Sequence, residues 1–241
     1  MDDNSFDEAL PEGYFRQSQL PLHALVFVLP LMILFEIGTQ FHPSDPIAFR
    51  LLQLFFHQLG ANGRFIPALS LVGILLSWHI ARKDRWNVRL ETLSTMIVES
   101  VALSLPLLAL GLAVSRWHIH VPLSSQAGAW RDDTILSLGA GIYEELMFRL
   151  ILMTALMVLL ADILRLERSW ASLLMVVISA VLFSMYHYLG HEPFQLQSFV
   201  FRTLAGIYFA VLFLTRGFGI TAGCHISYDI LIVALQAWAV R

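Results

Sequence analysis

Two glutamates and an arginine interrupt an otherwise apolar run of about thirty residues in the second half of the chain. They are Glu144, Glu145 and Arg149. Ionisable side chains in a membrane-length apolar segment are costly, so they usually face the interior of a helix bundle and mark function. Glu145 and Arg149 are four residues apart and share a helix face, where they can form an ion pair. Glu144 is rotated by about 100° from Glu145 and is the freer carboxylate, as a general base requires.

Two later apolar segments carry polar partners for such a carboxylate. His187 closes the first segment, with Phe183 one turn earlier on the same face. His225 and Asp229 begin the second and share a face, so they can bind a water or a metal, or fix each other's protonation state. One carboxylate and two histidines can activate a water molecule: the carboxylate takes the proton, and the histidines stabilise the developing oxyanion. With a metal such as zinc, Glu144, His187 and His225 would instead be ligands.

Each motif also has a purely structural interpretation. The glutamates can be tied into interhelical hydrogen bonds, His187 can be an interfacial residue, and Asp229 can simply orient a buried His225. Arg202, in a further apolar segment, can pair with Glu145 or Asp229, or bind a substrate carboxylate. The density of acids, bases and histidines in three late segments favours chemistry over structure.

The composition indicates that lipid surrounds most of the chain. Of the 241 residues, 57% are hydrophobic and only 14% are charged, whereas a soluble domain is about half apolar and a quarter charged. The net charge is −3 and no long basic block suggests a nucleic-acid partner. Cys224 is the single cysteine, which excludes an intrachain disulfide and a Cys-based zinc cluster.

The apolar segments predict an all-α fold, a polytopic membrane helix bundle. We expect residues 1–18 to form a polar, loosely ordered N-terminal tail and residues 19–241 a single transmembrane bundle, with the catalytic motifs in 134–230. About seven spans fit the length at about 20 residues each. An amphipathic stretch at 49–59 predicts an additional interfacial helix. The predicted spans are residues 20–41, 65–81, 92–114, 134–160, 170–189, 194–214 and 220–239.

The distribution of Lys and Arg residues and the depth of the two histidines in the membrane add two expectations. With the N-terminus inside, eight Lys and Arg residues face the cytoplasm and five the other side, so we expect a cytoplasmic N-terminus in a bacterial cytoplasmic membrane. Spans 170–189 and 220–239 run in the same direction, yet His187 lies late and His225 early. This leaves them roughly 15–20 Å apart in depth. We therefore expect the Gly-rich connection 215–223 to enter the protein as a buried turn.

The motifs in this order resemble the CPBP family, which contains the type II CAAX prenyl endopeptidases and bacteriocin-processing or immunity proteins. The resemblance covers about residues 130–240. It is carried by Glu144-Glu145-x-x-x-Arg149, Phe183-x-x-x-His187 and His225-x-x-x-Asp229. The sequence contains neither His-Glu-x-x-His nor Gly-x-Ser, motifs typical of other membrane proteases.

The resemblance implies an intramembrane endopeptidase in which Glu144 activates the attacking water with help from His187. His225 and Asp229 would complete the site as oxyanion stabilisers or polar ligands, and the neighbouring ion pair would hold Glu144 in place. Both a zinc-dependent and a metal-free glutamate mechanism have been described for the family. The expected partners are membrane lipid and a peptide or protein substrate at the membrane.

One position departs from the family pattern, and two other functions compete. Asp229 stands where prenyl-protein endopeptidases typically carry Asn, and an aspartate is a poorer oxyanion donor but a better metal ligand or histidine partner. A proton-coupled transporter could use the same groups as a relay, but it predicts inverted repeats, which the sequence lacks. The third function is a non-catalytic immunity or scaffold member of the family, against which the complete motifs argue.

Overall fold

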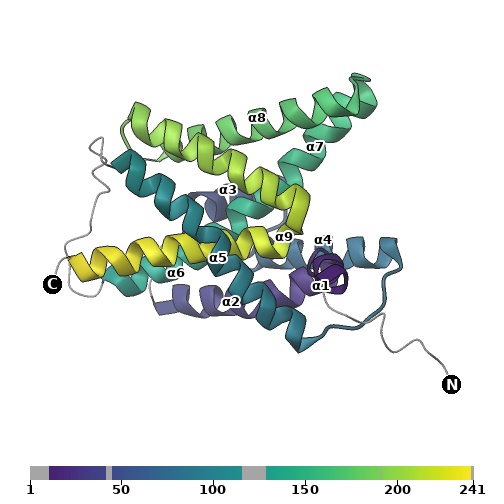
Figure 1. The fold of residues 1–241 in the computed structure, drawn as a ribbon, viewed down its shortest axis with the longest axis horizontal. Helices are drawn as coiled ribbons and strands as arrows, with labels where there is room; N and C mark the ends of the chain where they lie inside the picture. Colours follow the sequence, from purple (N-terminus) through teal and green to yellow (C-terminus); the bar gives the residue numbers. More distant parts are fainter. Residues whose placement is uncertain (1–10, 42–44, 116–128, 191, 240–241) are drawn as a thin grey trace.

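The computed structural model describes residues 11–41, 45–115, 129–190 and 192–239, and all regular secondary structure in these ranges is helical (Figure 1). The predicted all-α fold class is confirmed. The first half contains α1 (Pro11–Ser18), α2 (Pro21–Phe41), α3 (Ile47–Gln58), α4 (Ile66–Arg82) and α5 (Leu90–Ser115). The second half contains α6 (Ala129–Glu145), η1 (Leu146–Met153), α7 (Thr154–Met157), η2 (Val158–Ile163), α8 (Arg168–Tyr186), η3 (His187–Leu189) and α9 (Leu196–Ala239).

Five helical stretches in the described ranges are long and apolar enough to cross a membrane. They are Pro21–Phe41, Leu90–Val114, Trp130–Ile163, Arg168–Leu189 and Leu196–Trp238. The apolar α4 is shorter, with 17 residues. Large apolar side chains such as Leu34, Leu69 and Val98 are exposed on the outer faces, as a lipid-facing surface requires. These features identify an integral membrane protein.

Each predicted span corresponds to a helical segment, but the last two are joined. The predicted spans 194–214 and 220–239 are the two halves of α9, which bends at Gly217. Gly217 has φ 78° and ψ 178°, and glycine adopts positive φ without steric cost. The predicted interfacial stretch 49–59 falls largely within α3, whose position at the membrane interface stays a prediction.

The bend brings the second half of α9 back through the protein. Gly206 in the first half packs against Ala180 of α8, whereas Ile226 in the second half packs against Gly141 of α6. Figure 1 shows these two halves on either side of the bend, with α5 crossing over the second half. Residues 218–226 are all buried. The prediction that the connection enters the protein is confirmed: two helical segments meet directly at a kink at the non-helical Gly217, without a longer turn between them.

The N-terminal segment differs from the loosely ordered tail that we expected. Residues 11–18 form helix α1, which packs against α5 and α9. The cause is a buried cluster of polar contacts with residues far away in the sequence, described below. Residues 1–10 of the predicted tail lie outside the described residues.

The close packing of α6 on α9 gives a first prediction. A Cβ atom at Gly141 would lie 2.4 Å from Ile226 Cγ1 and 2.9 Å from Ile226 N. We predict that Gly141→Ala lowers the free energy of unfolding by about 1–3 kcal/mol, because the added methyl forces backbone shifts. Thermal unfolding in detergent measures the change.

The matched control is Gly73→Ala in α4, where nothing lies within 4 Å of the added Cβ. It should leave stability unchanged or raise it by up to about 1 kcal/mol. Equal stabilities for the two variants would contradict the close approach of α6 and α9.

Candidate active site

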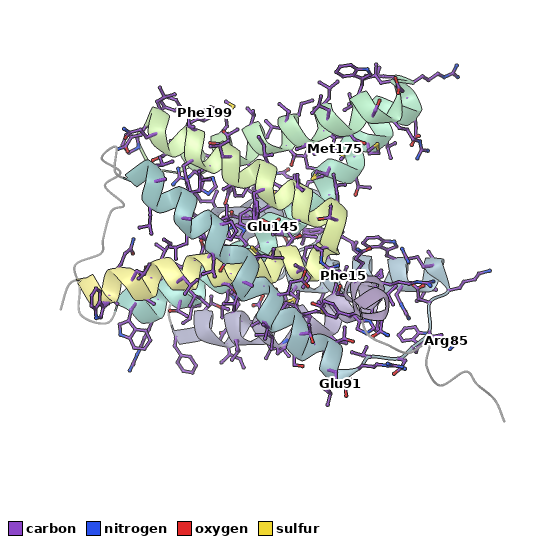
Figure 2. The ribbon with its side chains drawn as sticks, viewed as in Figure 1. Phe15, Arg85, Glu91, Glu145, Met175 and Phe199 are labelled. Atoms are coloured by element: carbon purple, nitrogen blue, oxygen red, sulfur yellow. The ribbon has the colours of Figure 1, made fainter. Side chains whose placement is uncertain are left out.

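The glutamate pair lies where α6 ends and the helix changes its pitch. The eight residues after Glu145 form the π-helical segment η1. A π-helix has i→i+5 hydrogen bonds, and such segments are frequent at functional sites. The apolar pattern of the sequence gives no sign of this change. Figure 2 shows Glu145 near the centre of the molecule, in the region where α5, α6 and α9 cross.

Glu145 bridges an arginine and a histidine. Its Oε2 lies 3.0 Å from Arg149 Nε, and its Oε1 lies 2.8 Å from His225 Nδ1. The side chains of Glu145 and Arg149 are completely buried. The predicted ion pair is therefore present. However, the contacts of Glu145 hold His225 in place, and not Glu144 as we expected.

Aromatic rings surround the guanidinium group of Arg149. Its central carbon lies 4.4 Å from the ring centre of Phe183, 5.4 Å from that of Phe209 and 6.0 Å from that of Phe148. Nη2 also donates a hydrogen bond of 3.3 Å to the carbonyl oxygen of Gly206. Cation–π contacts are strongest for such desolvated cations. Phe183, predicted to support the site, thus packs directly on the ion pair.

Glu144 presents one free carboxylate oxygen to two histidines. The hydroxyl of Tyr186 donates a hydrogen bond to Glu144 Oε1. Oε2 is buried and has no hydrogen-bond partner among the described residues. It lies 3.9 Å from His187 Nε2 and 3.8 Å from His225 Nε2. Both distances are longer than a direct N–H···O hydrogen bond.

Hydrogen bonds at Nδ1 orient both imidazole rings. His187 Nδ1 lies 2.8 Å from the carbonyl oxygen of Phe183, which can only accept. Nδ1 therefore carries the proton, and Nε2 of the neutral ring is an acceptor. His225 Nδ1 donates in the same way to the carboxylate of Glu145. Each ring is thus fixed with Nε2 toward Glu144.

Asp229 and His187 lie at the more exposed edge of the site. Asp229 Oδ2 lies 3.7 Å from His225 Nε2, one helical turn away. The side chains of Asp229 and His187 are 27% and 20% exposed, whereas those of Glu144 and His225 are 7% exposed. Asp229 and His187 are therefore the more exposed members of the site, and Glu144 and His225 lie deeper.

The four residues predicted to be catalytic lie together. The bend at Gly217 removes the depth mismatch of roughly 15–20 Å that the sequence spacing implied. As a result, the Nε2 atoms of His187 and His225 both lie within 3.9 Å of Glu144 Oε2, and Asp229 is adjacent. This grouping is an observation, whereas the catalytic role of each residue stays a prediction.

Arg202, predicted to support the site, has a different partner. Its guanidinium forms a bidentate pair with Glu192, with distances of 3.0 and 2.8 Å, and lies 5.7 Å from the ring centre of Tyr188. Neither predicted pairing, with Glu145 or with Asp229, occurs. Both oxygens of Glu145 are already engaged, and Glu192 lies close by, just before the start of α9.

Two residues of the site were missed in the sequence. Tyr186 binds Glu144, and the ring of Phe209 stacks on His225 with centres 4.5 Å apart and an angle of 19°. Tyr186 directly precedes His187, so a polar aromatic beside a candidate histidine was the available signal. Phe209 lies in an apolar run that contains several other aromatic residues, and nothing in the sequence distinguishes it.

The donor set does not form a metal site as it stands. One carboxylate and two imidazoles are ligands that zinc accepts. Over the described ranges, however, no group of three or more His, Cys, Asp or Glu side chains has an arrangement that could hold a metal ion.

The buried bridge gives a second prediction. Arg149→Met leaves the carboxylate of Glu145 buried without its cation, so we expect the free energy of unfolding to fall by about 3–5 kcal/mol. The double variant Glu145→Met/Arg149→Met removes both charges and should be less destabilised than the single variant. Chemical unfolding in detergent compares the two. A double variant that is less stable than Arg149→Met would contradict the ion pair.

Comparison with known proteins agrees with the motifs. Residues 127–231, just under half of the chain, match the family described as Type II CAAX prenyl endopeptidase Rce1-like. The matched segment contains every residue of the site described above. Searches of the curated proteins and of the solved structures found no match. Residues 127–231 are therefore similar to the Rce1-like family of type II CAAX prenyl endopeptidases, in agreement with the resemblance that the motifs carry.

Proposed function

We propose that this protein is an intramembrane endopeptidase that hydrolyses a peptide bond in a membrane-associated substrate, with Glu144 as general base. The observation that carries the proposal is the state of Glu144 Oε2. This oxygen is buried, has no hydrogen-bond partner among the described residues, and faces two imidazole nitrogens. The family match supports peptide hydrolysis as the reaction.

The first step is activation of water. A water molecule that donates a hydrogen bond to Glu144 Oε2 is also within reach of His187 Nε2, which accepts from its other proton. Glu144 takes one proton as the water oxygen attacks the carbonyl carbon of the substrate. The product of this step is a tetrahedral intermediate with a negatively charged oxygen.

The second step is collapse of the intermediate. A protonated His225 donates from Nδ1 to Glu145 and from Nε2 to the oxyanion, which stabilises the developing charge. Glu144 then gives its proton to the amine nitrogen as the C–N bond breaks. The products are a carboxylic acid end and an amine end of the substrate, and Glu144 returns to its ionised form; the acid then loses its proton, which the amine or the solvent takes up.

The remaining residues position these groups. Tyr186 holds Glu144 Oε1, so that Oε2 points toward the histidines. Asp229 lies beside His225 Nε2 and stabilises the protonated ring. An aspartate at this position supplies a negative charge to the protonated histidine. A neutral asparagine would supply none.

Glu144→Gln tests the general base directly. The substitution keeps the shape of the side chain but cannot accept the proton, so we predict that cleavage slows by at least about 100-fold. The assay uses purified protein and a panel of labelled membrane peptides, with elution volume and melting temperature to confirm folding. Glu91→Gln, at an exposed glutamate in the first turn of α5, is the matched control.

The outcomes separate the competing functions. A fully active Glu144→Gln variant would end the proposal. A wild-type protein that is folded but cleaves none of the peptides would favour the non-catalytic family member instead.

Removal of metal is a further test. Because the described donors form no metal cluster, we predict that the cleavage rate persists after incubation with a strong chelator and dialysis. The comparison is the same preparation with zinc restored. Loss of activity that zinc restores would reassign Glu144, His187 and His225 as ligands.

A further inference from the structure

A second buried ion pair lies at the bend of α9, one residue before Gly217. Arg216 Nε donates to Glu99 Oε1 at 2.6 Å, and Arg216 Nη2 donates to Glu99 Oε2 at 2.7 Å. Arg216 is only 8% exposed. Glu99 lies within α5, an apolar span where an unpaired charge is costly. The pair therefore ties the bend of α9 to α5.

Helix α1 completes the surroundings of this pair. Arg216 Nη2 also donates to Ser18 Oγ at 3.0 Å, and Nη1 donates to the carbonyl oxygen of Phe15 at 3.4 Å. The guanidinium carbon lies 4.3 Å from the ring centre of Phe15 and 5.5 Å from that of Tyr14. Figure 2 shows Phe15 beside the bend. All three guanidinium nitrogens thus have acceptors.

Tyr14 contacts the other member of the pair. Its hydroxyl donates a hydrogen bond to Glu99 Oε2. Burial, together with the hydrogen bond to the carboxylate of Glu99, raises the pKa of Tyr14 above its ordinary value. The hydroxyl therefore keeps its proton and remains a donor.

The connection from α1 to α2 covers the backbone of the bend. Gln19 Nε2 donates a hydrogen bond of 2.6 Å to the carbonyl oxygen of Thr215, one of the groups that a helix leaves unpaired at its end. A Cβ atom at Gly217 would lie 3.2 Å from Gln19 Cα, and one at Gly219 would lie 3.0 Å from Ala24 Cα. The bend is thus held by side chains and by direct backbone packing.

The position of the bend determines the position of His225. His225 lies eight residues beyond Gly217, which is about 12 Å along a helix. The intervening residues are buried and helical. A slip of the helix by one residue would rotate the imidazole by about 100°. His225 Nε2 would then no longer face Glu144.

We infer that Tyr14, Ser18, Glu99 and Arg216 form a clamp that positions His225 for catalysis. The four residues act through the bend and do not touch the reacting groups. The effect of this clamp on cleavage rests on the proposed function, but its effect on the helix does not. The family match begins at residue 127, so α1 and Glu99 are a contribution of the chain outside the matched segment.

Chemical labelling of Cys224 measures how often this helix opens, and no cysteine has to be introduced for the measurement. Cys224 is the single cysteine, it is completely buried, and it precedes His225. We predict that Arg216→Gln and Glu99→Gln each raise the rate of Cys224 labelling by a membrane-permeant maleimide at least about tenfold. Loss of charge-assisted hydrogen bonds makes local opening of the helix more frequent. The measurement uses the full-length protein in membranes.

The matched control is Arg202→Gln. It removes a bidentate pair of the same type, with Glu192, from the first half of the same helix. We expect it to label at the wild-type rate. Tyr14→Phe removes one hydrogen bond of the clamp, so we expect its Cys224 to be labelled about two- to tenfold faster than in the wild type. This variant tests the clamp if the charge variants do not accumulate in the membrane.

Peptide cleavage by the same variants tests positioning. We expect kcat to fall at least about tenfold with KM within about twofold of wild type, because His225 acts in the transition state and not in substrate binding. The exchanged pair Glu99→Arg/Arg216→Glu should recover part of both the slow labelling and kcat, since it restores opposite charges.

Three outcomes decide the inference. Wild-type labelling rates in Arg216→Gln, Glu99→Gln and Tyr14→Phe would overturn the clamp, whether or not the protein cleaves peptides. Faster labelling with unchanged kcat would overturn its role in positioning His225. If the wild-type protein cleaves no peptide, the proposed function fails, and faster labelling of the clamp variants still supports the clamp as a structural device.

Discussion

One buried carboxylate that needs two partners determines how this site is built. Glu145 is sealed from solvent, and an unpaired charge there would cost several kcal/mol. Its two oxygens engage Arg149 and His225. The end of α6 must therefore meet the second half of α9 at this point, and the aromatic rings packed on Arg149 follow from the same requirement. The position of Glu145 then also sets the position of Glu144, which directly precedes it in the chain.

Much of the site was predictable because its chemistry needs residues that are rare in membrane spans. Charged and imidazole side chains stand out against an apolar background, so Glu144, His187, His225 and Asp229 could be selected before their positions were known. The contact between Glu145 and Arg149 follows from helical spacing alone. The all-α class and most span boundaries follow from the length of the apolar runs.

The parts that escaped prediction depend on contacts between distant segments. A glycine-rich stretch is compatible with a loop and with a bend, and packing against the α1–α2 connection and α2 favours a bend at Gly217. From the sequence, the N-terminal segment is predicted to be a polar tail, because its hydrogen-bond partner Arg216 lies some 200 residues away. The π-helical pitch of η1 has no sequence signature. Arg202 pairs with Glu192, which lies outside the predicted spans and was therefore not considered as a partner.

The bend in α9 also has a mechanical consequence. Two helical segments joined directly at Gly217 supply the wall that packs on α8 and the segment that carries His225. Because the two halves meet at Gly217 with no loop between them, a displacement of one half at the bend is passed to the other. The side chains of His187 and Asp229 form the more exposed side of the site that this bend positions.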